Sequence, residues 1–259
     1  MRPLCLDHLS LYDVPALELI QIAAELGCAA VSLFVTPGTL GPYLDLTRDK
    51  AAKAEVLSAL RDTGLSVGVV EPFMLVAETD WDLLERSAAL AAEMNGTVNA
   101  LCFDQEPGRQ QDSFGRLAEI ARVAGARMAV EGFTLSSVRT LADALAIANT
   151  VGPQVGLTVD MLHVIRTGGS WADIAALPQE RIFHVQIDDG PRDAPSDLLE
   201  EATVARLPPG CGEFDVASFI PLVPPAALLA VEAPFRAPPG MTPLERARTI
   251  VNATRALLV

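Results

Sequence analysis

Short apolar runs that alternate with longer helical segments restrict the fold of this chain more than any other feature. Each run is rich in Val, Leu, Ile and Ala and is bounded by Gly, Pro or polar residues, which is the pattern of a buried strand. The eight runs lie at residues 4–9, 29–35, 65–70, 97–103, 127–130, 155–159, 181–187 and 227–231. Helices are expected at residues 14–26, 46–63, 80–94, 112–124, 135–150, 170–177 and 214–222, and from 242 nearly to the C-terminus.

This alternation predicts an α/β protein, a single (β/α)8 barrel. Continuously apolar strands are typical of a parallel sheet that is covered by helices. The first strand is not followed by a GxGxxG motif, which favours a closed barrel over an open dinucleotide-binding sheet. The 259 residues, half of them hydrophobic, can supply one large core. We therefore expect one domain over residues 1–259.

Charge and cysteine usage restrict the partners and the cellular location. The formal net charge of −14 repels a phosphate backbone, so we expect no nucleic acid partner. No apolar run reaches about 18 residues, the length of a membrane span, so we expect no membrane partner. The four cysteines lie far apart without a CxxC pair, which indicates reduced thiols. We expect a soluble cytoplasmic protein that acts on a small molecule; assembly into a homo-oligomer is left open.

Acidic or amide side chains stand at the ends of several predicted strands. In a barrel these ends converge on the face that carries the active site. Glu131, Asp160, Gln186 and Glu232 belong to the fifth to eighth strands, and their oxygens would repel one another unless a divalent cation neutralised them. Oxygen ligands suit Mn²⁺ or Mg²⁺ best, and Co²⁺, Ni²⁺ or Zn²⁺ could also bind. Glu71, after the third strand, is equally well explained as a substrate contact or as a solvated acid.

The three histidines each allow two interpretations. His163 follows Asp160 by one turn, so it could hydrogen-bond a ligand or a metal-bound acid, or it could be a core residue. His184 lies two residues before Gln186 and therefore points inward, either to support the site or to pack in the core. His8, near the end of the first strand, is either substrate-facing or structural.

One arginine stands in a long segment, residues 188–215, in which an irregular loop is expected. Arg206 precedes a glycine turn and could bind a carboxylate, a phosphate or hydroxyl groups of a substrate. The alternative is a surface arginine that pairs with Glu200 or Glu201.

Five motifs, in order along the chain, carry a family resemblance. They are Val130-Glu131-Gly-Phe133, Asp160-Met-Leu-His163 with Gly168, His184-Val-Gln-Ile-Asp188, Pro209-Gly-Cys-Gly-Glu213 and Val231-Glu232. The series resembles that of the xylose isomerase-like sugar phosphate isomerase/epimerase superfamily. This group includes inosose dehydratases, hydroxypyruvate isomerases, ketose 3-epimerases, 3-dehydroshikimate dehydratases and, more distantly, endonuclease IV.

The resemblance also implies roles for individual residues. It implies one divalent metal ion held by Glu131, Asp160, Gln186 and Glu232, with His163 close to the substrate. Many members carry His at this ligand position of the seventh strand. This chain has Gln186 there, and in this it is similar to hydroxypyruvate isomerases and some 3-dehydroshikimate dehydratases. Cys211 stands where those relatives have an acidic residue.

The chemistry that the resemblance implies is proton transfer next to a carbonyl through a metal-stabilised enediolate. Glu131 and Glu232 would take and return the proton, and His163 would protonate a leaving hydroxyl in a dehydratase. Our first expectation is an isomerase or epimerase of a small polyhydroxy carbonyl, sugar-like compound. The alternative enzyme is a dehydratase of a cyclic hydroxy-ketone such as 3-dehydroshikimate or an inosose. A sugar-binding barrel without turnover is the non-enzyme alternative, and a nuclease is the least favoured.

Overall fold

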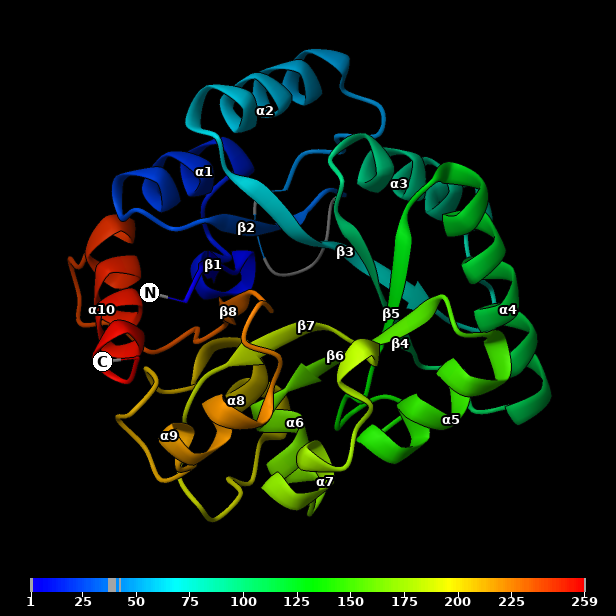
Figure 1. Cartoon of the computed structure of the whole chain (residues 1–259). Coiled ribbons are helices and arrows are strands. Elements are labelled where there is room, and N and C mark those ends of the chain that lie inside the picture. Colours follow the sequence, from blue (N-terminus) through cyan, green and yellow to red (C-terminus); the bar gives the residue numbers. More distant parts are fainter. Residues whose placement is uncertain (1, 37–40, 42, 259) are drawn as a thin grey trace.

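Eight parallel strands close on themselves in chain order in a computed structural model, which describes residues 2–36, 41 and 43–258 (Figure 1). The ring is closed between the first and last strands, where Cys5 is paired with Ala230. This arrangement confirms the predicted (β/α)8 barrel. The strands are β1 (Leu4–Leu6), β2 (Ala30–Phe34), β3 (Ser66–Leu75), β4 (Thr97–Cys102), β5 (Arg127–Glu131), β6 (Val155–Asp160), β7 (Ile182–Ile187) and β8 (Leu229–Val231).

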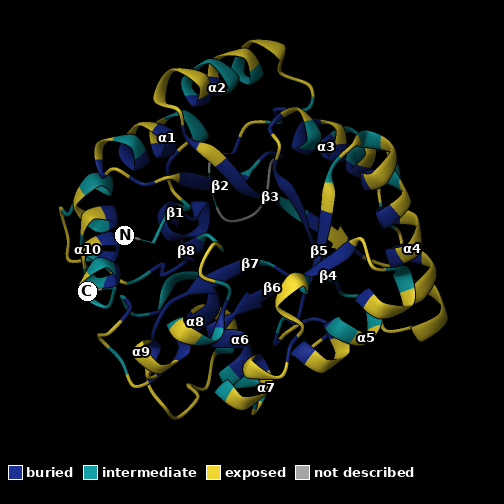
Figure 2. Cartoon of the chain, viewed as in Figure 1, coloured by how far each residue is buried: buried dark blue, intermediate teal, exposed yellow. Residues whose placement is uncertain are grey.

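Helices surround the strands and expose their outer faces, whereas the strands are largely buried (Figure 2). The α-helices are α1 (Ala16–Glu25), α2 (Lys50–Thr63), α3 (Trp81–Glu93), α4 (Pro107–Ala124), α5 (Leu141–Val151), α6 (Met161–Arg166), α7 (Trp171–Ala175), α8 (Leu198–Val204), α9 (Val216–Phe219) and α10 (Pro243–Ala256). Short 3₁₀ helices span η1 (His8–Leu11), η2 (Gln179–Arg181) and η3 (Ile220–Leu222).

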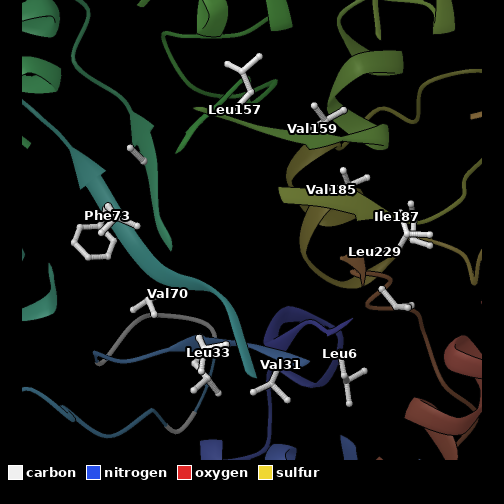
Figure 3. Close-up of a cluster of buried hydrophobic side chains, with 14 of the residues drawn as sticks. Leu6, Val31, Leu33, Val70, Phe73, Leu157, Val159, Val185, Ile187 and Leu229 are labelled. Carbon is white, nitrogen blue, oxygen red and sulfur yellow. The ribbon is translucent and has the colours of Figure 1, made fainter. Parts of the chain in front are cut away.

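Each strand directs alternate side chains to opposite faces of the sheet, and the two faces differ in chemistry. The outward positions are apolar and pack under the helices, as Leu6, Val31 and Val159 do (Figure 3). Inward positions include small and polar residues; Cys5 and Ser32, for example, lie 3.4 Å apart, sulfur to oxygen. The apolar core therefore lies between the strands and the helices, and the barrel interior carries polar groups toward its mouth.

Several element boundaries differ from those that the sequence predicts. Strand β3 continues to Leu75, so Glu71 lies within the strand rather than after it. Helix α4 begins at Pro107 because Glu106 accepts hydrogen bonds from two backbone amides of the first turn. Helix α5 begins at Leu141, where Thr140 and Asp143 form a capping box, and the preceding residues form a loop.

The segment after β7 is more ordered than the expected irregular loop. It contains α8, and the backbones of Asp189 and Leu207 form an antiparallel bridge. The Asp189 carboxylate accepts hydrogen bonds from the backbone amides of Gly190, Gly210 and Phe214. The buried Asp189 carboxylate thus connects the beginning of this segment to its end and stabilises its position on the barrel.

The structure also bears on the expectations of reduced cysteines and of no membrane-spanning segment. The four cysteines are free thiols, as expected, and Cys211 alone among them is exposed. Within the described residues, none of the helices has the length and apolar character that crossing a membrane requires.

Candidate active site

The inward positions at the carboxyl ends of the strands bring polar side chains together. Side chains continue to alternate between the two faces of the sheet up to the barrel mouth, and paired residues on neighbouring strands share a face. Asp160 is paired with Gln186, and Glu131 is paired with Thr158. The residues that meet there are Asp7, Glu71, Asn99, Glu131, Asp160, Gln186, Asp188 and Glu232, all buried except for the half-buried Glu71. Five of them lie in strands β3 to β7, and Asp7, Asp188 and Glu232 directly follow β1, β7 and β8, so the site is built on the barrel itself.

Arg206 lies among these acids. Its Nη1 is 2.8 Å from Asp160 Oδ2 and also contacts Asp188, and its Nη2 is 2.8 Å from Glu232 Oε2. The Nε hydrogen goes to the carbonyl oxygen of Ala202 in α8, at 3.0 Å. The guanidinium is 1% exposed and is therefore an internal cation that neutralises part of the acidic cluster.

The surface interpretation of Arg206 is wrong. Glu200 pairs with Arg236, and Glu201 pairs with Arg166. The folding of α8 back over the barrel, which the sequence did not predict, carries Arg206 inward. A substrate contact by Arg206 remains a prediction; in this structure its three nitrogens bind protein atoms.

Asn99, in the middle of β4, joins two of the acids. Its amide nitrogen donates to Glu71 Oε1 at 3.1 Å and to Glu131 Oε2 at 2.7 Å. Its amide oxygen accepts from the Thr158 hydroxyl at 2.7 Å, which fixes which end of the amide faces the carboxylates. One oxygen of Glu131 is therefore held in place, and the other is directed toward His163.

His163 stands beside Glu131 and Asp160. Asp160 caps α6 and accepts from the His163 backbone amide, which places the ring one turn above the strand end. Its Nε2 is 3.7 Å from Glu131 Oε1 and 3.6 Å from Asp160 Oδ2. Its Nδ1 lies 3.1 Å from the Thr134 hydroxyl, and Phe133 packs edge-on against the ring.

Burial and neighbouring charges shift the titration of the site. Burial raises the pKa of Glu131 to about 8, with Asp160 adding repulsion, and it raises that of Glu232 well above its ordinary value. Burial alone would raise the pKa of Asp160 too, but Arg206 and His163 outweigh it and the pKa falls below its usual range. Burial lowers the pKa of His163 to about 4, so the ring is neutral near pH 7.

The donor set fits a divalent cation. Gln186 Oε1 is buried and has no hydrogen-bond partner among the described residues. Glu131, Asp160 and His163 each offer a ligand atom within 4.8 Å of the others, and Asp7, Glu71 and Glu232 form a second such group. Among the described residues, the buried carboxylates of this site outnumber the arginine that contacts them, Arg206, and a divalent cation would offset this excess.

The four predicted ligands come to one end of the barrel. Gln186 donates its amide hydrogen to Glu232 Oε1 at 2.9 Å, and Arg206 connects Glu232 to Asp160. Glu131 joins them through His163, which lies within 3.7 Å of both Glu131 and Asp160. That these four residues hold one ion remains a prediction.

The other two histidines are placed in the interior. His8 accepts from the Phe34 backbone amide at Nδ1 and hydrogen-bonds the Val14 carbonyl oxygen through Nε2, so both nitrogens serve the backbone. This favours the structural interpretation of His8. His184 lies inside the barrel beside Gly68, where a β-carbon would come within 3.0 Å of the ring. The glycine makes room for the imidazole, two positions below Gln186.

Four residues of the site were not among the sequence candidates: Asp7, Asn99, Thr134 and Asp188. Asp7 and Asp188 continue the inward alternation of β1 and β7, so a strict two-residue period would have found them. Asn99 lies mid-strand and Thr134 in a loop, where no sequence signal marks them.

Comparisons with known proteins agree with this fold. The family model described as "Xylose isomerase-like TIM barrel" matches residues 20–226. A 3-dehydroshikimate dehydratase of Pseudomonas aeruginosa is 33% identical over 244 residues, covering 86% of this chain and 37% of that protein. One of Pseudomonas putida is 26% identical over 218 residues, covering 78% and 33%. The chain thus spans about a third of the length of these curated relatives.

Solved structures share the fold at low sequence identity. A xylose isomerase-like TIM barrel/4-hydroxyphenylpyruvate dioxygenase fusion protein aligns with a TM-score of 0.81 and 22% identity, over 99% of this chain and 42% of that one. The IOLI protein, whose structure contains a zinc atom, aligns with a TM-score of 0.77 and 19% identity, over 100% and 98%.

Proposed function

The chain belongs to the xylose isomerase-like TIM barrel family, and from this premise we propose that it is a dehydratase of a small cyclic hydroxy-ketone such as 3-dehydroshikimate. The curated relatives support the substrate class, although the match covers only 37% and 33% of their lengths. They favour a dehydratase over an isomerase or epimerase, which is the first expectation from the sequence motifs. The proposed reaction removes one molecule of water across two adjacent ring carbons.

The observation that carries the proposal is the difference between the two glutamates. Both oxygens of Glu232 are engaged, one by Gln186 and the other by Arg206. Glu131 has one oxygen held by Asn99, while its other oxygen faces His163. An epimerase that uses two carboxylate bases needs both residues free to exchange protons, whereas an elimination needs one. The arrangement therefore supports Glu131 as a single base.

His163 supplies the other half of an elimination. Glu131 accepts the proton from the carbon next to the ketone, the carbon–carbon double bond forms, and the bond to the β-hydroxyl breaks. The departing hydroxyl takes the Nε2 proton of His163 and leaves as water. Loss of that proton would leave an imidazolate anion. The proton on Glu131 therefore passes to Nε2, and Glu131 is again a carboxylate. Glu131 Oε1 and His163 Nε2 are neighbours at 3.7 Å, so the transfer requires the two side chains to approach to hydrogen-bond distance.

Glu131, Asp160, Gln186 and Glu232 are the residues that would hold the divalent cation. When bound, it supplies Lewis-acid polarisation of the ketone, which acidifies the neighbouring C–H bond. Arg206 contacts Asp160 and Glu232 and fixes their orientation from the side of α8. The aromatic ring of Phe133 covers one side of His163 and helps to exclude water from the proton path.

The direct test is turnover of 3-dehydroshikimate by the full chain with Mg²⁺ or Mn²⁺. Loss of water extends the conjugation of the ring, so a dehydratase produces a new ultraviolet band. Glu131→Gln should abolish the band, while Glu119→Gln, on the exposed face of α4, should retain it. Deuterium exchange from D₂O without the band would show an isomerase or epimerase, and neither signal would favour a barrel that binds without turnover; both results would overturn the proposal.

A further inference from the structure

Thr134 lies in the loop after β5 and is 4% exposed. Its hydroxyl oxygen is 3.1 Å from His163 Nδ1, and its carbonyl oxygen accepts from Arg139 Nε at 3.1 Å. The hydroxyl is thus held at one nitrogen of the ring while the other nitrogen faces the acids. Which partner donates across the 3.1 Å contact depends on the position of the ring proton.

The surroundings of Nε2 decide that position. Asp160 Oδ2 and Glu131 Oε1 lie 3.6 and 3.7 Å from Nε2. A nitrogen lone pair directed at these oxygens would be repelled, whereas an N–H bond there is attracted. The proton of a neutral ring therefore belongs on Nε2, and Nδ1 is left as an acceptor.

Two further contacts hold His163 in place. The His163 backbone amide donates to Asp160 Oδ1 at 3.3 Å, and the Phe133 ring packs edge-on with its centroid 4.2 Å from that of the imidazole. The Thr134 hydroxyl then has a fixed acceptor in front of it.

We propose that Thr134 is a positioning residue that donates its hydroxyl hydrogen to His163 Nδ1 and so keeps the ring proton on Nε2. The functional consequence rests on the proposed dehydratase chemistry: the Nε2 hydrogen is the one that the leaving hydroxyl takes. Without Thr134 the buried Nδ1 lone pair loses its donor, and the tautomer with its proton on Nδ1 is no longer disfavoured at that nitrogen.

The chain is well suited to a spectroscopic test because it contains three histidines. In the full chain with ¹⁵N-labelled histidine and Mg²⁺, His163 should show a protonated Nε2 and an unprotonated Nδ1. His8 is an internal reference, because the Phe34 amide donates to its Nδ1 and requires the same tautomer. The His163 signals are assigned by their loss in His163→Gln. A protonated Nδ1 on His163, alone or together with a protonated Nε2, would overturn the proposal.

Substitutions at Thr134 provide a second test of the proposal. In Thr134→Val, which preserves the shape, the Nδ1 resonance should move toward that of a nitrogen without a hydrogen bond, and kcat for 3-dehydroshikimate should fall about tenfold with little change in KM. Thr134→Ser should restore both. If Thr134→Val changes neither the resonance nor kcat, Thr134 has no positioning role. The resonances report on the tautomer even if 3-dehydroshikimate is not turned over, so failure of the proposed function is distinguishable.

Discussion

Nη1 of Arg206 lies 2.8 Å from Oδ2 of Asp160, although the two residues are 46 positions apart in the chain. Asp160 ends β6, whereas Arg206 follows α8 in the segment that folds back over the barrel mouth. The same guanidinium reaches Asp188 and Glu232. A single buried cation therefore joins β6, the end of β7 and the end of β8, and it lowers the electrostatic cost of placing their carboxylates side by side.

Removal of this cation should destabilise the fold strongly. In Arg206→Met the buried carboxylates lose their counter-charge, so the free energy of unfolding should fall by about 3–5 kcal/mol. Chemical denaturation measures the change. The matched control is Arg236→Met, because Arg236 is 65% exposed in its pair with Glu200 and should contribute less than about 1 kcal/mol. Equal effects of the two substitutions would show that Arg206 is not the internal counter-charge.

Loss of the Asn99 amide should affect activity through Glu71 and Glu131. Asn99→Ala leaves both carboxylates without their shared donor, so kcat should fall about tenfold or more, and the free energy of unfolding by about 1–3 kcal/mol. Asn252→Ala, on the exposed face of α10, serves as the control. Normal kcat in Asn99→Ala would mean that Glu131 does not depend on this hydrogen bond.

The residues at the strand ends were predictable because their signal is local. An apolar run that ends on Glu131 or Asp160 shows in the sequence where the strand stops and what stands there. Once the eightfold alternation indicates a barrel, its topology brings these ends together, whatever the intervening helices contain. The fold and the acidic half of the site follow from this reasoning.

The remainder of the site depends on contacts between distant segments. The inward placement of Arg206 requires α8 and the anchoring of the segment by Asp189, neither of which has a periodic pattern in the sequence. Asn99 is an ordinary polar residue of a strand until Glu71, Glu131 and Thr158 are placed around it. Such residues are identified by their partners, and a single sequence does not show the partners.

Metal binding should distinguish Asp160 from His163. Asp160→Asn replaces a predicted ligand carboxylate, so the metal content of the purified protein should fall to background; His163→Gln should retain metal because its predicted role is toward the substrate. Elemental analysis after dialysis against Mn²⁺ gives the content, and circular dichroism checks the fold. Because His163 lies within 4.8 Å of Glu131 and Asp160 ligand atoms, loss of metal in His163→Gln would assign it to the ligand set instead.

Stability should fall at mildly acidic pH in part because of His8. Burial lowers its pKa from 6.5 to about 4, so folding disfavours its charged form. Its contribution to stability is therefore complete above pH 6.5 and is lost as the pH falls toward 4. This shift corresponds to about 3 kcal/mol. Chemical denaturation at a series of pH values measures the loss.

The substitution His8→Gln isolates this contribution. A glutamine can accept from the Phe34 amide and donate to the Val14 carbonyl, as His8 does, but it does not titrate. Between pH 6.5 and 4 the wild-type protein should lose about 3 kcal/mol more than His8→Gln, because His163 and His184 titrate in both and their effects cancel. Parallel stability curves for the two proteins would show that His8 is accessible to protons in the folded state, and its structural role would have to be given up.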